Sequence, residues 1–478
     1  MSRRWPVLAI FILSGAAGLI YEVVWARQLV LVFGNTTQAV SAILTGFFGG
    51  IAIGSVIGGR IADRARRPLR MYGLLELILV VVVLLTPITF RLLHDVYRGV
   101  FSGLEAEPQV LALIRFGLSL LALGPATILM GATLPTLTRH LTRDPSNLSS
   151  SFGRLYAANT FGAIIGTIAA GFILIELLGL TGTLLAGATC SAIAGIAALI
   201  LDRTRPLPPV ADPAPAAAPA PVPAANQPRP RLRLALIVAY VSGLTSLGYQ
   251  VLWTRLLASG TGDSTYVFTT ILAIFLIGLA LGAVAFNVYR TRINTINLLA
   301  LGQVVIAALV TVGMILIISR GATGGLLYLT LSFRGLFTQF ALPVMVVVLP
   351  ATFIMGLTFP AASALIADPE GHVGSNAGLL LSANTLGAIT GTFLIPFMII
   401  PAVGSPTAIA LIALLNAGMG IALAFGGRIQ GRLPRTVTGG AGVVMAGGLA
   451  LMLVAGGFFV DPNSFLIRNS GGTVLLPP

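Results

Sequence analysis

Residues 14–29, with the sequence SGAAGLIYEVVWARQL, place two charged side chains inside an apolar segment that is long enough to cross a bilayer. Glu22 lies beside Tyr21 and Trp25, and Arg27 follows farther along the same segment. A charge near the centre of a bilayer costs a few kcal/mol, so such side chains usually face a protein interior or a wet cavity. A carboxylate flanked by aromatic rings suits a cationic ligand, through ion pairing and cation–π contact, and a buried glutamate can also take up a proton.

The spacing of these residues decides which of them can act together. Tyr21 and Trp25 are one helical turn apart and share a face. At about 100° per residue, Arg27 lies roughly 140° around the helix from Glu22, so the two charges need partners on other helices. Glu76 is a second acid within an apolar segment. Two interpretations stay open: these residues bind a ligand or a proton, or the acids and arginines form ion pairs between helices without any ligand.

The whole signature occurs a second time. Residues 242–257, SGLTSLGYQVLWTRLL, repeat the first copy with its tyrosine, tryptophan and arginine retained and its glutamate replaced by glutamine. Asn159 and Asn384 match in ANTFGAIIGT and ANTLGAITGT, where they either make packing hydrogen bonds or face the same site. The candidate substrate-binding residues are therefore Tyr21, Glu22, Trp25, Arg27, Glu76 and Asn159 in the first copy, and Tyr249, Gln250, Trp253, Arg255, Gln303 and Asn384 in the second.

Membrane helices must position these residues, because the composition excludes an ordinary soluble protein. Of the 478 residues, 56% are hydrophobic and 9% are charged, whereas soluble domains carry about 25% charged residues. A spanning helix needs about 20 mostly apolar residues. Thirteen segments meet this requirement: 6–33, 37–62, 70–90, 109–138, 152–176, 180–201, 233–258, 265–288, 295–318, 336–366, 373–400, 404–426 and 437–460.

The apolar segments form two copies of a six-helix unit. We predict a first repeat at 1–201, a Pro/Ala-rich cytoplasmic linker at 202–231, a second repeat at 232–427, an extra membrane helix at 428–460 and a tail at 461–478. Parallel six-plus-six repeats are the architecture of major facilitator transporters, whose halves move about a central site. The predicted fold class is therefore an all-α, polytopic membrane protein with a major facilitator-like 6+6 repeat and one additional C-terminal helix.

The positive charge of the chain is a topology signal. The net charge of +14 comes from 28 arginines and no lysine. Twenty arginines lie on the side of the predicted bundle that holds the N-terminus, six lie on the other side, and two lie within helices. This asymmetry marks the cytoplasmic side. We therefore predict a cytoplasmic N-terminus, a location in the cell inner or plasma membrane, and no nucleic-acid partner. The first segment has no polar break, so we expect a retained span rather than a signal peptide.

One short loop resembles a motif of the major facilitator transporters. The sequence GGRIADRARR matches the pattern glycine-x-x-alanine-aspartate-arginine followed by basic residues, through Gly59, Ala62, Asp63, Arg64 and Arg67. Arg66 stands where the motif has its second glycine. The resemblance implies that Gly59, Asp63, Arg64 and Arg67 form a conformational gate.

Two longer signatures, SGxxGLIYEVVWxRQL and GPATxxMGATLP, resemble the membrane region of the fused major facilitator/spermidine synthase family. In that family an aminopropyltransferase domain, with a glycine-rich turn and a catalytic aspartate, follows the membrane region. The residues after 461 are too few to form such a domain. We therefore expect no catalytic residue, no cofactor and no metal site in this chain.

Three functions stay open. The first is a secondary transporter for a small cationic amine, with proton coupling; the family resemblance implies a polyamine as this amine. The second is a non-catalytic membrane subunit that anchors a separate spermidine synthase-type aminopropyltransferase. The third is a carrier of a lipid or an organic anion, for which Arg27 and Arg255 would be the ligands. The lipid bilayer and a small-molecule substrate are the expected partners.

Overall fold

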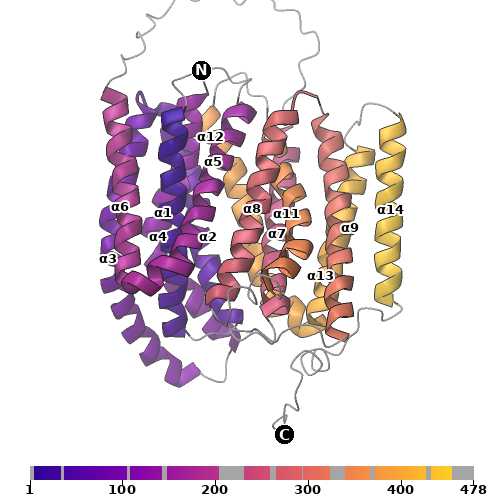
Figure 1. Ribbon diagram of the computed structural model, residues 1–478, viewed down its shortest axis with the longest axis horizontal. Helices are drawn as coiled ribbons and strands as arrows, with labels where there is room; N and C mark the ends of the chain where they lie inside the picture. The colour runs from indigo at the N-terminus through magenta and orange to yellow at the C-terminus, as the bar shows by residue number, and fades with distance from the viewer. Residues whose placement is uncertain are drawn as a thin grey trace, which may run out of the picture.

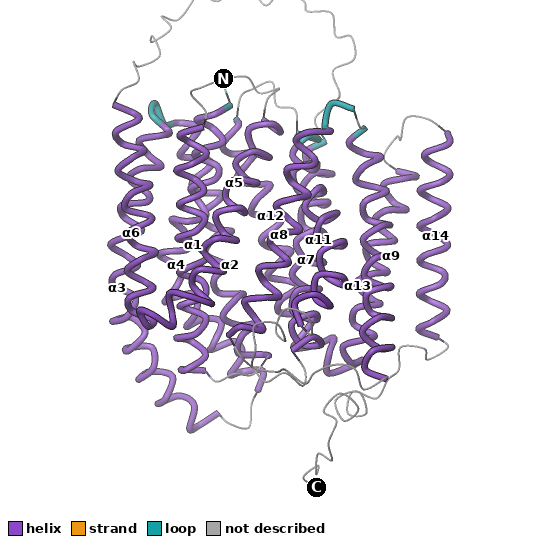
Figure 2. Tube along the Cα trace, in the orientation of Figure 1, coloured by secondary structure: helices purple, strands orange, loops and turns teal. Residues whose placement is uncertain are grey.

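The computed structural model describes residues 5–33, 37–104, 108–142, 148–203, 231–258, 265–292, 294–322, 340–366, 372–426 and 432–454. Most of the predicted linker, and the predicted tail, lie outside these residues. Within the described part, the chain forms thirteen α-helices that stand side by side in one bundle (Figure 1). Figure 2 shows only helices and short loops among the described residues, so the predicted all-α fold class is confirmed.

Six of the described helices precede the linker and seven follow it. The first set is α1 (Trp5–Phe33), α2 (Thr37–Arg64), α3 (Pro68–Leu104), α4 (Pro108–Leu141), α5 (Leu148–Ala169) and α6 (Ile175–Arg203). The second set is α7 (Leu232–Ala258), α8 (Thr265–Tyr289), α9 (Thr295–Ala322), α11 (Leu342–Ser363), α12 (Val373–Leu394), α13 (Ile400–Gly426) and α14 (Arg432–Val454). Ten described stretches are long and apolar enough to cross a membrane, and two of these stretches contain two helices each.

The two sets repeat one another even in their irregularities. α5 continues through the π-helix η2 (Ala170–Leu174) into α6, where Gly179 interrupts the helix at φ 65°. α12 continues through the π-helix η4 (Ile395–Ile399) into α13, where Gly404 does the same at φ 77°. Only glycine adopts such a positive φ readily, because it has no Cβ. Gly179 falls between the predicted spans 152–176 and 180–201, and Gly404 is the first residue of the predicted span 404–426, so local glycine chemistry sets each turn.

Glycines bring helices of one half into backbone contact. A Cβ on Gly54 of α2 would clash with the backbone of Ile128 in α4, and one on Gly282 of α8 would clash with the backbone of Phe353 in α11. In a membrane, helices gain little from the hydrophobic effect on association and depend instead on such close packing between small residues. The glycine-rich strips of α2 and α8 therefore hold each half together.

Among the described helices, the most extensive contacts between the halves are those of α2 with α12 and of α5 with α8. We call the end of the bundle where α1 begins the N-side, and the opposite end the far side. Toward the far side, Thr45 and Thr392 share a hydrogen bond of 3.1 Å, and the rings of Phe172 and Tyr266 stack with centroids 5.6 Å apart. Phe359 of α11 adds a third contact toward the N-side, against rings of α5.

Large apolar side chains cover the outside of the bundle. Ile78, Leu85 and Val444 are 50%, 52% and 76% exposed, and many other leucines, isoleucines and valines of the described helices are similarly exposed. Patches of this extent on a soluble protein would mark an interface. On a bundle of apolar helices they are the surface that contacts lipid tails, and the chain is a multi-pass membrane protein.

Candidate functional site

Glu22 lies near the middle of α1, on a face that turns toward α4 and α5. One turn before it on this face, a Cβ on Gly18 would lie 3.0 Å from Cε of Met130 in α4. Two turns before it, Gly15 packs against the backbone of Asn159 in α5. The Glu22 side chain is half-buried and, among the residues that the structure describes, forms neither a hydrogen bond nor an ion pair. Its carboxyl group is therefore available to a ligand.

The second half repeats this face with a neutral side chain. Gln250 of α7 is buried, and Gly243 packs against the backbone of Asn384 in α12. Within the described helices, neither the Gln250 amide nor the side-chain amides of Asn159 and Asn384 form a hydrogen bond. The structure thus gives each half one face with unpaired polar groups, carrying an acid in the first half and only amides in the second.

The aromatic residues next to these polar groups point into the cores of the two halves. The Tyr21 and Trp25 rings stack 5.4 Å apart, are fully buried, and pack into the core of the first half. Trp25 Nε1 donates a hydrogen bond of 3.2 Å to Thr86 Oγ1 in α3. Tyr249 and Trp253 stack in the same way, 5.5 Å apart, in the core of the second half. The predicted shared face exists, but it packs each half rather than lying beside Glu22.

The two helical arginines lie apart from the acids. Arg27 is half-buried near the far end of α1 and makes no ion pair with Glu22 or Glu76. Arg255 is exposed at the corresponding end of α7. The interhelical ion pairs weighed above between these arginines and acids are therefore not formed among the described residues.

Glu76 lies inside the first half, in a polar cluster between α1, α3 and α6. Its side chain is 0% exposed. Ser14 of α1 donates a hydrogen bond of 2.5 Å to Oε1, and the hydroxyls of Tyr72 in α3 and Ser191 in α6 face the same carboxyl group. The sequence predicted Glu76 as a member of one ligand site with Glu22, whereas the structure places it against the face of α1 that carries Ser14 and Tyr21, roughly 80–100° around the helix from Glu22.

The repeat partner of Glu76 forms an equivalent cluster between α7, α9 and α13. Asn416 of α13 donates a hydrogen bond to Oε1 of Gln303, accepts one of 2.8 Å from the Tyr249 hydroxyl, and lies 3.4 Å from Thr245 Oγ1. Sequence reasoning missed Asn416. The signal was present, because Asn416 aligns with Ser191 at the offset that relates Gly179 to Gly404.

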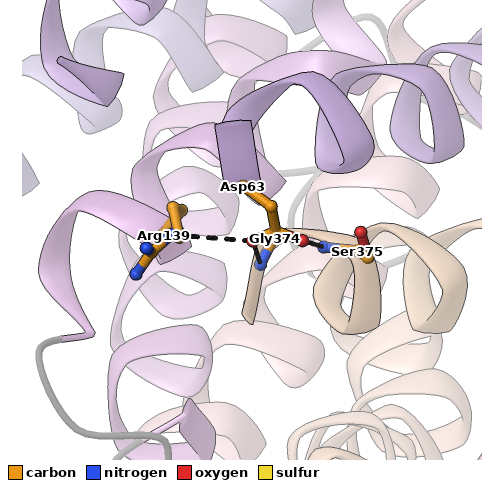
Figure 3. Close-up of polar contacts among 4 residues, drawn as sticks. All are labelled: Asp63, Arg139, Gly374 and Ser375. Carbon is orange, nitrogen blue, oxygen red and sulfur yellow. Dashed lines mark hydrogen bonds and ion pairs between the residues drawn. The ribbon is translucent and has the colours of Figure 1, made fainter. Parts of the chain in front are cut away.

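The predicted gate residues form a contact between the halves at the N-side. The Asp63 carboxylate at the end of α2 accepts hydrogen bonds of 2.7 Å from the backbone amides of both Gly374 and Ser375, at the start of α12 (Figure 3). Arg139 of α4 approaches the same carboxylate, with Nε 3.6 Å from Oδ1. An acid at a helix N-terminus satisfies free N–H groups and complements the helix dipole. We call this arrangement the Asp63 contact.

The other residues of the motif take different places. Gly59 lets the backbone of α2 approach the backbone of Gly374 closely. Arg67 pairs with Asp202 at the end of α6, at 3.1 Å, and so connects helices of the same half. Arg64 is exposed and makes no hydrogen bond or ion pair in the described part of the chain. The resemblance therefore located one inter-half contact, at Asp63, together with its neighbours.

Two six-helix copies, joined along α2–α12 and α5–α8 and held at the N-side by an acid on a helix N-terminus, define a secondary-transporter fold. Comparison with family models agrees: residues 6–392 match the Major Facilitator Superfamily. The chain belongs to this superfamily. Its membrane-spanning character and its relation to transporters follow from that membership.

Comparison with individual proteins finds one relative by sequence and several solved structures with a similar fold. The chain is 32% identical over 205 residues to polyamine aminopropyltransferase 2 of Streptomyces coelicolor, a match that covers 41% of this chain and 34% of that protein. The chain thus matches about a third of that relative's length. The fold is similar to the E. coli fucose:proton symporter FucP, with TM-score 0.54, 13% identity, and 88% and 97% of the two chains covered. It is also similar to a bacterial homologue of the iron transporter ferroportin in an outward-facing state, with TM-score 0.56, 14% identity, and 88% and 99% covered.

Proposed function

We propose that this chain is a secondary transporter of a small cationic amine, with Glu22 as the ligand of the positive charge. The observation that carries the proposal is the unpaired carboxyl of Glu22 on the inward-turned face of α1. An amine charge would supply the partner that the described protein groups do not. Asn159, Gln250 and Asn384 would add amide contacts to the same substrate, because they too are unpaired on matching faces. The partial match to a polyamine aminopropyltransferase favours a polyamine as the amine.

Proton coupling is part of this proposal. Glu22 can hold either a proton or the charged amine, but not both at once, so binding of one displaces the other. Such an exchange couples movement of the amine in one direction to movement of a proton in the other, so a pH gradient across the membrane would drive amine transport. The Asp63 contact would hold the N-side closed in one state of the cycle and open when α2 and α12 separate. With the arginine-rich N-side in the cytoplasm of a plasma-membrane protein, this closed state would face outward.

Uptake by purified protein in liposomes tests the proposal. Labelled spermidine and putrescine would be supplied with and without an imposed pH gradient. Glu22→Gln reproduces the amide of the second half, so it should fold, yet lose a charge-assisted contact worth about 1.5–3 kcal/mol. Amine affinity should then fall roughly ten- to a hundred-fold, and uptake should no longer respond to pH.

A matched control keeps this test specific. Glu176→Gln makes the same chemical change at an exposed glutamate of α6 and should leave uptake unchanged. If Glu22→Gln transports amines with unaltered affinity and pH dependence, Glu22 is not the ligand. If the wild-type protein transports neither amine, the amine proposal itself fails.

The match to an aminopropyltransferase also supports a second candidate function. In this alternative, the chain is a membrane subunit that binds a separate aminopropyltransferase and does not itself transport. Affinity purification of the tagged chain from its native membranes, followed by an aminopropyltransferase assay of the eluate, distinguishes the two. Activity that co-purifies with a chain inactive in liposomes supports the subunit, whereas uptake without any co-purifying activity supports the transporter.

A further inference from the structure

The cluster around Glu76 contains a buried acid with no positive partner. Glu76 is fully buried, and no arginine or histidine of the described helices forms an ion pair with it. The titratable groups that face it are Tyr72 of its own helix and Tyr21 of α1, while α6 contributes Ser191. Cys190 of α6 lies near Tyr21. An isolated carboxylate in such surroundings is strongly disfavoured and is usually neutralised by taking up a proton.

The hydrogen bonds of the cluster agree with a neutral acid. Ser14 occupies Oε1, whereas Oε2 is buried without a hydrogen-bond partner. The hydroxyl oxygens of Tyr21, Tyr72 and Ser191 are buried without one as well. An ionised carboxylate only accepts hydrogen bonds, but a carboxylic acid also donates one. A proton on Oε2 would therefore give this group a donor facing hydroxyl oxygens that can accept.

The second half has a neutral side chain at the position that corresponds to Glu76. There the equivalent of Glu76 is the amide of Gln303, also fully buried, and the equivalent of Ser191 is Asn416, which binds that amide. The helices that carry Ser191 and Asn416 correspond to each other, since each is preceded by a π-helix and contains one positive-φ glycine, Gly179 or Gly404. One copy of this fold thus accommodates an uncharged side chain of nearly the same shape as glutamic acid.

We propose that Glu76 carries a bound proton and forms a proton-binding site inside the first half, separate from Glu22. The inference goes beyond the proposed function, since it assigns a proton site off the substrate-facing surface and holds whether or not the chain transports an amine. It also assigns different roles to the two membrane acids. Glu22 is unpaired and free to exchange its partner, whereas Glu76 is enclosed by hydroxyl groups.

Infrared difference spectroscopy of the purified protein in lipid nanodiscs at neutral pH tests the proposal. Wild type minus Glu76→Gln should show the C=O stretching band of one carboxylic acid, which shifts in D₂O. Glu22→Gln should leave that band in place, and Glu176→Gln should remove only a carboxylate band. A Glu76→Gln spectrum that instead loses a carboxylate band would overturn the proposal.

Two further measurements cover a Glu76 variant that does not fold and a metal ion that takes the place of the proton. If Glu76→Gln alone does not fold, Glu76→Gln with Ser191→Asn rebuilds the amide pair of the second half, and its spectrum should lack the same band. A sodium ion could also neutralise the acid. If sodium chloride, but not choline chloride, raises the unfolding temperature of the wild type and this effect disappears in the Glu76 variant, a metal ion occupies the site and the proton assignment is wrong.

Discussion

The Asp63 contact should control how far the N-side opens. Asp63→Asn keeps the shape of the side chain and one acceptor oxygen, but it replaces the other oxygen with an NH₂ group that faces the N–H of Gly374 or Ser375. One charge-assisted hydrogen bond at 2.7 Å is lost, and the interactions with the α12 dipole and with Arg139 weaken. Because the Asp63 side chain is only 11% exposed, water screens these terms little.

The size of the effect follows from these contacts. A hydrogen bond to a charged group contributes about 1.5–3 kcal/mol, and a charge at a helix N-terminus adds about 0.3–1 kcal/mol. The loss therefore shifts the ratio of N-side-open to N-side-closed molecules by roughly twenty- to several-hundred-fold, since each 1.4 kcal/mol is a factor of ten. A rare open state would become a large fraction of the population.

Distances between spin labels measure this shift. Labels at Arg70→Cys and Arg292→Cys, in a Cys190→Ala background, lie on exposed positions at the N-side of different halves. Asp63→Asn should add a population with a longer distance between the labels. Arg64→Gln is the control, because this neighbouring side chain is exposed and has no partner in the described chain. An Asp63→Asn distribution no broader than that of Arg64→Gln would refute the reasoning.

Other contacts lead to smaller, separate tests. Gly54→Ala forces a methyl group against the backbone of α4, so it should lower the free energy of unfolding by about 1–3 kcal/mol and lower the unfolding temperature. Gly440→Ala is the control, because its methyl group meets nothing within 4 Å. Equal unfolding temperatures for the two variants would contradict the close packing of α2 against α4. Asn416→Ser should cost about 1–3 kcal/mol for each buried group that it leaves unpaired, and an unchanged stability would show that the cluster contributes nothing. With Cys190 replaced by alanine, a cysteine at Ala217 should react only with reagents that reach the cytoplasm, so labelling from outside would overturn the predicted topology.

Much of the fold was predictable, because membrane helices are encoded locally. Apolar runs of sufficient length gave the helices, and the repeat of the helix-one signature gave the two copies that the glycine breaks at Gly179 and Gly404 display. The family motif also led to Asp63. The placement of the termini relative to the membrane and the domain boundaries within the undescribed segments stay predictions.

The candidate site was predictable only in part. Helical periodicity predicted that Tyr21 and Trp25 share a face and that Arg27 lies away from Glu22, since the angle between residues on one helix is fixed. It could not show that Tyr21 packs into the core of its half while Glu22 stays unpaired. Asn416 was missed because its partners, on α7 and α9, are more than a hundred residues away in the sequence.

The sequence by itself determined the class of this protein, its helices, its internal repeat and the polar residues at membrane depth, because each of these depends on residues that are neighbours along the chain. The tertiary structure alone decided which polar residues meet. It placed Glu76 with Ser14 inside the first half, gave Gln303 the partner Asn416, left Glu22 unpaired, and set Asp63 on the N-terminus of α12. The physical reason is that a helix fixes the direction of each side chain around its own axis, while the group found in that direction depends on how the other helices pack.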